Sequence, residues 1–144
     1  MRAQIGDTGL LSDDTRGISV FQENGIVHRG VNGDGKRILR YEVDGNMIKS
    51  AQKRCDYAIG IPGSDKVIFI ELKGTDIKHA SIQILDTITE LGVKLNGFEL
   101  HARIVCSRIP APDLRSTQII KLERKLAQTN GSLIKKCKEL EEAI

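Results

Sequence analysis

Two strand-like runs separated by a turn constrain the fold of this chain more than any other feature. Residues 55–61 and 66–73 are rich in Ile, Val and Phe, and the sequence PGSD lies between them at residues 62–65. Proline and glycine in such a position are typical of a tight turn that joins two antiparallel strands. The sequence therefore predicts a β-hairpin over residues 55–73.

Three charged residues interrupt this apolar hairpin: Asp56 in the first run, and Glu71 and Lys73 in the second. An unpaired charge inside a core costs several kcal/mol, so these three side chains are expected to share one role. A turn centred between Gly63 and Ser64 places Asp56 directly opposite Glu71. Because opposite residues of an antiparallel pair have Cβ atoms about 4.5 to 5.5 Å apart, the two carboxylates are predicted to converge.

Strand alternation assigns the remaining hairpin side chains to two faces. Lys73 falls on the face of Glu71, while Ala58 and Gly60 leave space on that face around Asp56. The opposite face is apolar and carries Tyr57, Ile59, Ile61, Ile68, Ile70 and Leu72. The sequence predicts that one face of the hairpin is core and the other is a site.

Two close carboxylates repel each other unless a cation lies between them. Mg²⁺ and Mn²⁺ prefer oxygen ligands, and Asp56, Glu71 and the backbone carbonyl of Leu72 supply them. Lys73 can stabilise negative charge on a phosphate or orient an attacking water. This set of residues indicates hydrolysis of phosphodiester bonds.

An aspartate, fourteen intervening residues, and then Glu71-Leu72-Lys73 at the end of an apolar strand followed by a helix resemble the PD-(D/E)xK nuclease superfamily. The resemblance covers residues 37–109. It implies an α/β fold with a restriction-endonuclease-like or Holliday-junction-resolvase-like αβββαβ core, whose mixed central sheet is flanked by helices. It also implies Mg²⁺-dependent cleavage of DNA, or less often of RNA.

The resemblance implies catalytic roles for Asp56, Glu71 and Lys73, and a supporting role for Gln83 in the helix that follows. Glu42 is the candidate for an additional acid, and Glu23 is a weaker candidate. Two alternatives remain open. Glu71 and Lys73 at alternate strand positions can form a solvated ion pair worth at most about 1 kcal/mol, and Gln83 can be a polar group on a helix surface.

The rest of the chain extends this core into a single predicted domain over residues 1–144. A strand is predicted over residues 37–43, and the apolar spacing predicts a helix over residues 76–95 and a strand over residues 98–109. Asp113 is the predicted N-cap of a further helix, which begins a C-terminal helical extension over residues 113–144.

Basic residues gather immediately before the hairpin, although the net charge of the chain is only +3. Such a patch favours a phosphate-bearing partner, while a solvated basic face is the alternative. With no Trp, two Tyr and three Phe, the chain has few rings for stacking on single strands, so duplex or structured DNA is favoured over RNA. The predicted nucleic-acid-binding residues are Lys36, Arg37, Arg40, Lys49, Lys53, Arg54 and Lys78.

The sequence also leads to expectations about the membrane, the cellular compartment and the cysteines. No apolar run approaches the roughly 20 residues that span a bilayer, so no membrane partner is expected and the cytoplasm is the expected compartment. Three cysteines far apart in the sequence, Cys55, Cys106 and Cys137, are expected to be reduced and without chemistry.

Apolar residues of the C-terminal third recur at helical spacing and predict a stripe that can pack against a second copy as a homodimer. The stripe comprises Ile119, Leu122, Leu126, Leu133, Cys137, Leu140 and Ile144. The alternative is that the chain breaks at Gly131 and folds back on its own sheet. For the function, the alternative to a nuclease is a non-cleaving nucleic-acid-binding or assembly module in a defence or repair complex.

Overall fold

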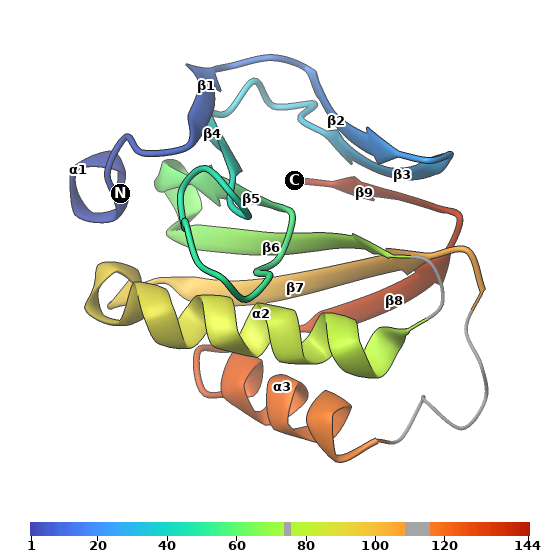
Figure 1. The fold of residues 1–144 in the computed structure, drawn as a ribbon. Helices are drawn as coiled ribbons and strands as arrows, with labels where there is room; N and C mark the ends of the chain where they lie inside the picture. The colour runs from blue at the N-terminus through green and yellow to red at the C-terminus, as the bar shows by residue number, and fades with distance from the viewer. Residues whose placement is uncertain (74–75, 109–115) are drawn as a thin grey trace.

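The computed structural model describes residues 1–73, 76–108 and 116–144, and the side chain of Lys73 is outside the described part. It is a mixed α/β structure in three layers (Figure 1). A six-stranded sheet forms the middle layer, two helices cover one face, and a three-stranded sheet covers the other. The six strands lie in the order β1 (Leu10–Asp14), β4 (Ile38–Glu42), β5 (Tyr57–Ile61), β6 (Lys66–Lys73), β7 (Glu99–Cys106) and β8 (Leu133–Cys137).

The central hairpin forms in the predicted register. Strands β5 and β6 are antiparallel, with Tyr57 opposite Ile70 and Ile59 opposite Ile68. A 3-10 turn over Pro62–Ser64 joins them, and Asp65 closes it with a left-handed φ of 52°. Aspartate tolerates this conformation better than most residues do, which explains its place at the end of the turn.

The sheet is mixed because a helix separates β6 from β7. Strands β1, β4, β5 and β6 are mutually antiparallel neighbours, whereas β7 runs parallel to β6 and β8 runs parallel to β7. Helix α2 (Ile77–Leu91) makes the connection from β6 to β7, and the side chain of Asp76 caps it by accepting the N–H of His79. A 3-10 turn over Gly92–Leu95 follows, so the predicted helix over residues 76–95 is confirmed with its last turn tightened.

Helices α2 and α3 (Thr117–Ala127) lie side by side on one face of the large sheet (Figure 1). They bury an apolar cluster that includes Ile84 of α2, Leu122 of α3 and Phe69 of β6. The short helix α1 (Arg2–Ile5) joins the same cluster through Ile5.

The opposite face of the large sheet is covered by the small sheet β2 (Ile18–Glu23), β3 (Ile26–Val31) and β9 (Glu139–Ala143). Between the two sheets lies a second apolar cluster, which contains Ile59, Ile68, Ile70 and Leu140. Strands β2 and β3 are antiparallel, and β9 pairs with β3 in parallel.

The prediction of one core face and one open face on the hairpin is wrong, because both faces are core. Val67 and Phe69 share the face of Glu71 and pack beneath the helices. Gly60 does not leave open space either, since a Cβ there would lie 2.6 Å from Met1 Sδ. Only the end of the hairpin near Glu71 is left for a polar site.

The predicted C-terminal helical extension over residues 113–144 is also wrong. Helix α3 ends at Ala127, and the residues after it form β8 and β9. The chain turns at Asn130, which has a left-handed φ of 65°, and then at Gly131, where a Cβ would lie 1.5 Å from the carbonyl oxygen of Leu100. Only glycine fits so close to β7, and the chain is therefore directed into a strand beside it.

The N-cap of α3 is Ser116, whose hydroxyl accepts the N–H of Ile119, and the predicted cap Asp113 lies outside the described residues. The predicted apolar stripe is divided among three elements, with Ile119 and Leu122 on α3, Leu133 on β8 and Leu140 on β9. Because α3 buries its apolar residues against the sheet of the same chain, these residues no longer support the prediction of a homodimer. Among the described residues, no helix has the length and hydropathy to cross a membrane.

Candidate active site

Asp56 and Glu71 meet at the end of the hairpin through two reciprocal hydrogen bonds. The backbone N–H of Asp56 donates to Glu71 Oε1 at 3.1 Å, and the backbone N–H of Leu72 donates to Asp56 Oδ2 at 2.8 Å. Asp56 is 8% exposed and Glu71 is 0% exposed. Each carboxylate therefore accepts a backbone N–H from the segment that carries the other, and the pairing of Tyr57 with Ile70 places Asp56 opposite Glu71 in the predicted register.

Neighbouring elements hold the backbone on both sides of Asp56. The carbonyl of Asp56 accepts the N–H of Val43 at 2.9 Å, which continues the pairing of β4 with β5. One residue earlier, the N–H of Cys55 donates to Thr87 Oγ1 of α2 at 3.0 Å. Asp56 is thus positioned from β4, β6 and α2 together.

A cavity of about 160 Å³ opens next to Asp56. Its lining residues are Glu23, Glu42, Asp44, Lys53, Asp56 and Tyr57. Glu42, the predicted additional acid, and Glu23, the weaker candidate, are both part of this wall. Glu71 is not, and it lies buried behind Asp56.

The carboxylates make the cavity electrostatically negative, and the raised pKa of Tyr57 in its wall reflects this. Burial raises the pKa of Tyr57 to about 12, and the charge and hydrogen bond of Glu23 and the charges of Asp56 and Glu42 add to the increase. Tyr57 donates its hydroxyl to Glu23 Oε1 at 3.2 Å and stacks on Phe21 with ring centroids 4.2 Å apart. A cation would reduce the mutual repulsion of these carboxylates.

The oxygen atoms at Asp56 fit a hard divalent cation. Oδ2 accepts the N–H of Leu72, and Oδ1 accepts no hydrogen bond from the residues that the structure describes. In a strand, the N–H and C=O of one residue point toward the same neighbouring strand, so the Leu72 carbonyl also points toward the side of Asp56.

Within residues 1–73, 76–108 and 116–144, no three His, Cys, Asp or Glu side chains are grouped so as to hold a metal ion. The side chains of Asp56 and Glu71 with the Leu72 carbonyl are a partial ligand set. Mg²⁺ commonly completes such a set with water and substrate phosphate.

Gln83 lies on the buried face of α2 and is 2% exposed. Both atoms of its side-chain amide are buried without a hydrogen-bond partner in the described part of the chain. The alternative interpretation of Gln83 as a surface polar group is therefore wrong. An unpaired buried amide costs about 1 to 3 kcal/mol, so its presence calls for a functional explanation.

Lys73 is the last residue of β6, and its backbone pairs in register with Cys106 of β7. Its side chain lies outside the described residues. The backbone position alone agrees with the predicted place of the lysine, two residues after Glu71 on the same strand face.

The three arginines of the predicted basic patch all contact other side chains. Arg37 forms two hydrogen bonds to Asp13, Arg54 pairs with Glu90 at 2.8 Å, and Arg40 lies 4.4 Å from the ring centre of Phe21. The lysines of the predicted patch are exposed at Lys36, Lys49, Lys53 and Lys78.

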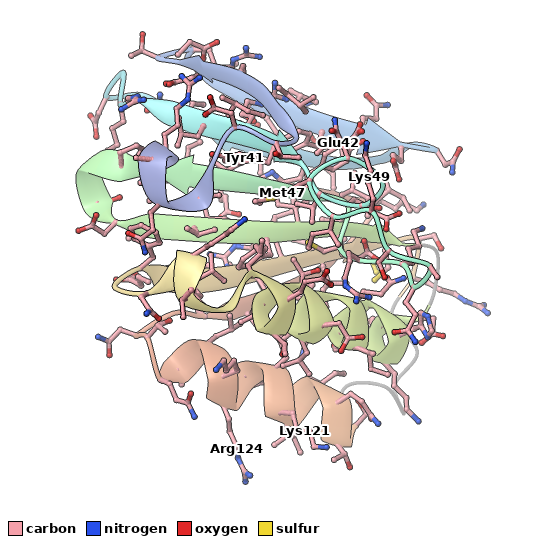
Figure 2. The ribbon with its side chains drawn as sticks, turned by 60° about the vertical axis from the view of Figure 1, so that its left-hand side comes forward. Tyr41, Glu42, Met47, Lys49, Lys121 and Arg124 are labelled. Carbon is pink, nitrogen blue, oxygen red and sulfur yellow. The ribbon has the colours of Figure 1, made fainter. Side chains whose placement is uncertain are left out.

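Figure 2 places Glu42, the last residue of β4, and Lys49, in the loop that follows β4, at the same end of the molecule. Lys121 and Arg124 project from α3 on the opposite side. Lys53, which belongs to the loop between β4 and β5, lines the cavity itself.

The sequence prediction missed Asp44 and the role of Tyr57. Asp44 lies two residues after the end of β4, and its Oδ1 accepts the N–H of Arg54 at 2.8 Å while it also lines the cavity. Tyr57 was assigned to the apolar face, where its ring does pack. Its hydroxyl end, which reaches the cavity, carries no signal in strand alternation.

Comparisons with protein-family models, with curated proteins and with solved structures found no match to this chain.

Proposed function

We propose that this protein is a metal-dependent nuclease that hydrolyses phosphodiester bonds of DNA. The observation that carries the proposal is the reciprocal pairing of Asp56 and Glu71 beside an acidic cavity. A buried carboxylate pair is costly unless a cation balances it, and a divalent ion with a phosphate substrate does so.

The order of the elements supports the same proposal. Three antiparallel strands, β4, β5 and β6, are followed by α2 and by β7 parallel to β6. This order agrees with the βββαβ part of the αβββαβ core that the resemblance to PD-(D/E)xK nucleases implies. The helix α1 before it has only four residues, so the resemblance is carried by the strands and α2.

The proposed roles follow from the positions of the residues. Asp56, Glu71 and the Leu72 carbonyl hold Mg²⁺ or Mn²⁺, which when bound polarises the phosphate and favours deprotonation of a water. Lys73 stabilises negative charge on the phosphate and orients the attacking water. Glu42 in the cavity wall can accept a hydrogen bond from that water, and Gln83 supports the site with its amide.

DNA is the proposed substrate because Lys53 lines the acidic cavity and further exposed lysines lie shortly before and after the hairpin. Lys49 and Lys53 belong to the loop between β4 and β5, and Lys78 lies in the first turn of α2. Lysines at such places bind backbone phosphates through charge and without reading the sequence. They would bring a phosphate toward Asp56 against the repulsion of the carboxylates.

A second candidate function is a non-cleaving DNA-binding or assembly module. The full burial of Glu71 favours it, since a catalytic carboxylate must reach the metal ion and Glu71 does not line the cavity. In that case the pair of Asp56 and Glu71 would be a structural clasp at the end of the hairpin.

One assay separates the two candidates. The protein is incubated with supercoiled plasmid, linear duplex and branched DNA in Mg²⁺ or Mn²⁺, with EDTA as the blank. The nuclease proposal predicts metal-dependent cutting that Lys73→Ala abolishes and Lys121→Ala, on the far side of the molecule, retains. DNA binding without any cutting by the folded wild type would favour the module instead.

A further inference from the structure

Two of the three cysteines lie next to each other in the sheet, although they are far apart in the sequence. Cys106 is the last residue of β7 and Cys137 is the last residue of β8, and the two are direct partners in the parallel register. Neighbouring strands are about 4.8 Å apart, and a disulfide needs Cα atoms about 4.4 to 6.8 Å apart. The backbone spacing of this pair therefore suits a disulfide.

The two side chains also point to the same side of the sheet. Cys106 belongs to the apolar cluster beneath the helices, and Leu133, on the same face of β8 as Cys137, packs against that cluster. The Cys106 thiol donates to the carbonyl oxygen of Lys136 at 3.7 Å, so its sulfur lies over the residue that precedes Cys137. The backbone N–H of Lys138 donates to the Cys106 carbonyl at 2.7 Å and so connects the ends of β7 and β8.

The two thiols differ in access to solvent. Cys137 is exposed, whereas Cys106 and Cys55 are buried. Burial, together with the neighbouring Cys137 thiol, raises the pKa of Cys106 to about 11, so Cys106 is protonated at neutral pH. An oxidant can reach Cys137 first, and Cys106 is then the nearest thiol in the described part of the chain.

We propose that Cys106 and Cys137 form a thiol-oxidation site, which hydrogen peroxide converts into a disulfide between β7 and β8. The Cys137 thiolate attacks one peroxide oxygen, the O–O bond breaks, and the departing hydroxide takes a proton to become water. The Cys106 sulfur attacks the resulting sulfenic acid, the S–O bond breaks, and the hydroxide leaves with the Cys106 proton as a second water. Two thiols lose two electrons, and one peroxide becomes two waters.

The expected consequence of this oxidation is a more stable attachment of β8 to the sheet. Strand β8 is the edge of the large sheet and pairs only with β7 there, and its residues Ile134, Lys136 and Cys137 are exposed. A covalent link at its end would fix β8 to β7 and restrict the unfolded chain between the two cysteines. Oxidation is therefore expected to raise the midpoint of thermal unfolding.

The test treats the full chain with equimolar hydrogen peroxide and measures the intact mass, followed by alkylation of the unfolded protein and peptide mapping. The proposal predicts a mass decrease of about 2 Da, a Cys106–Cys137 linkage, and alkylation at Cys55 alone. The control Cys137→Ser changes an exposed residue and should keep both Cys55 and Cys106 alkylatable with no mass decrease.

Two results would overturn the proposal. One is wild-type protein in which Cys137 gains oxygen atoms while Cys106 is still alkylated, because the thiols then do not combine. The other is a Cys137 disulfide that links two chains. Neither depends on nuclease activity, so the outcome is independent of the proposed function.

Discussion

The backbone N–H of Asp56 lies 3.1 Å from Glu71 Oε1, so a buried carboxylate of β6 holds the residue that precedes β5. This contact has a structural part, the hydrogen bond, and an electrostatic part, the negative charge. The two parts can be separated by substitution at Glu71.

Glu71→Ala removes the acceptor of the Asp56 N–H and leaves a buried space, so the free energy of unfolding is expected to fall by about 2 to 3 kcal/mol. Glu71→Gln keeps an acceptor oxygen of similar position and should cost less than half as much. Urea denaturation of the two variants measures the difference. Equal losses would mean that the charge of Glu71, and not its hydrogen bond, stabilises the strand end.

Replacing Gln83 by an apolar residue is expected to raise stability and to lower activity. Gln83→Met replaces an unpaired buried amide by an apolar chain of similar shape, so the free energy of unfolding should rise by about 1 kcal/mol while DNA cleavage falls. Denaturant titration and a cleavage rate for the same preparation check both effects. The matched control Gln118→Met, at a partly exposed position on α3, should change neither.

A loss of stability in Gln83→Met would contradict this expectation, since it would show that the amide makes a stabilising contact. A more stable variant with unchanged cleavage would remove Gln83 from the site and leave its burial without an explanation.

The hairpin and its register could be predicted because they depend on local signals. The PGSD turn sets the pairing of β5 with β6, and this register places Asp56, which directly precedes β5, opposite Glu71 of β6. The period of α2 was equally clear, since Ile77, Ala80, Ile84 and Ile88 all lie in the core.

The features that were not predicted from the sequence depend on contacts between distant segments. Leu133 and Leu140 keep helical spacing in the sequence, but Gly131 fits only against the Leu100 carbonyl of β7, and that contact directs the chain into strands. Asp44 reaches the cavity because its N–H donates to the Cys55 carbonyl at 3.1 Å, which continues the pairing of β4 beyond Glu42. The strand predicted over residues 37–43 stops one residue short of this contact.

Binding of DNA is expected to depend on lysines of the loop after β4. Lys49→Ala should weaken binding to all sequences alike and reduce the slope of log K against log salt by about 0.9 in magnitude, the share of one phosphate contact. Lys121→Ala, which changes an exposed lysine on the opposite side in Figure 2, should leave the slope unchanged. Fluorescence anisotropy over a series of salt concentrations measures both.

If both lysine variants lower the slope equally, binding is diffuse over the surface and the acidic cavity is not the place where DNA enters. Arg37 offers a further comparison, because it is engaged with Asp13 and Arg37→Ala should affect stability more than the salt slope.

Glu142 is expected to make stability depend on pH. Burial alone would raise its pKa, but hydrogen bonds from His28 at 2.9 Å and from Arg103 outweigh burial and lower the pKa from its ordinary value of 4.5. A lowered folded-state pKa means that the stabilisation is present above the unfolded value and is lost as the pH falls through the folded value. Glu142→Gln should therefore cost roughly 2 kcal/mol near pH 7 and progressively less below pH 4.5.

Urea denaturation of wild type and Glu142→Gln across this pH range gives the difference directly. A cost that is the same at about pH 3 and at about pH 7 would show that the shape of the side chain, and not its charge beside Arg103 and His28, is what stabilises β9 against β7.

The proposed function depends on one claim above the others, that Asp56 and Glu71 together hold a catalytic divalent ion. Crystals grown with Mn²⁺ and measured for anomalous scattering locate that ion without any assumption about substrate. We expect one peak in contact with Asp56 Oδ1, Glu71 and the Leu72 carbonyl, at roughly the 2.0 to 2.2 Å distances of hard-cation oxygen ligands, and no peak there in Asp56→Asn. A saturating Mn²⁺ concentration that leaves Asp56 without a peak, or places the ion only among Glu23, Glu42 and Asp44, would contradict that claim.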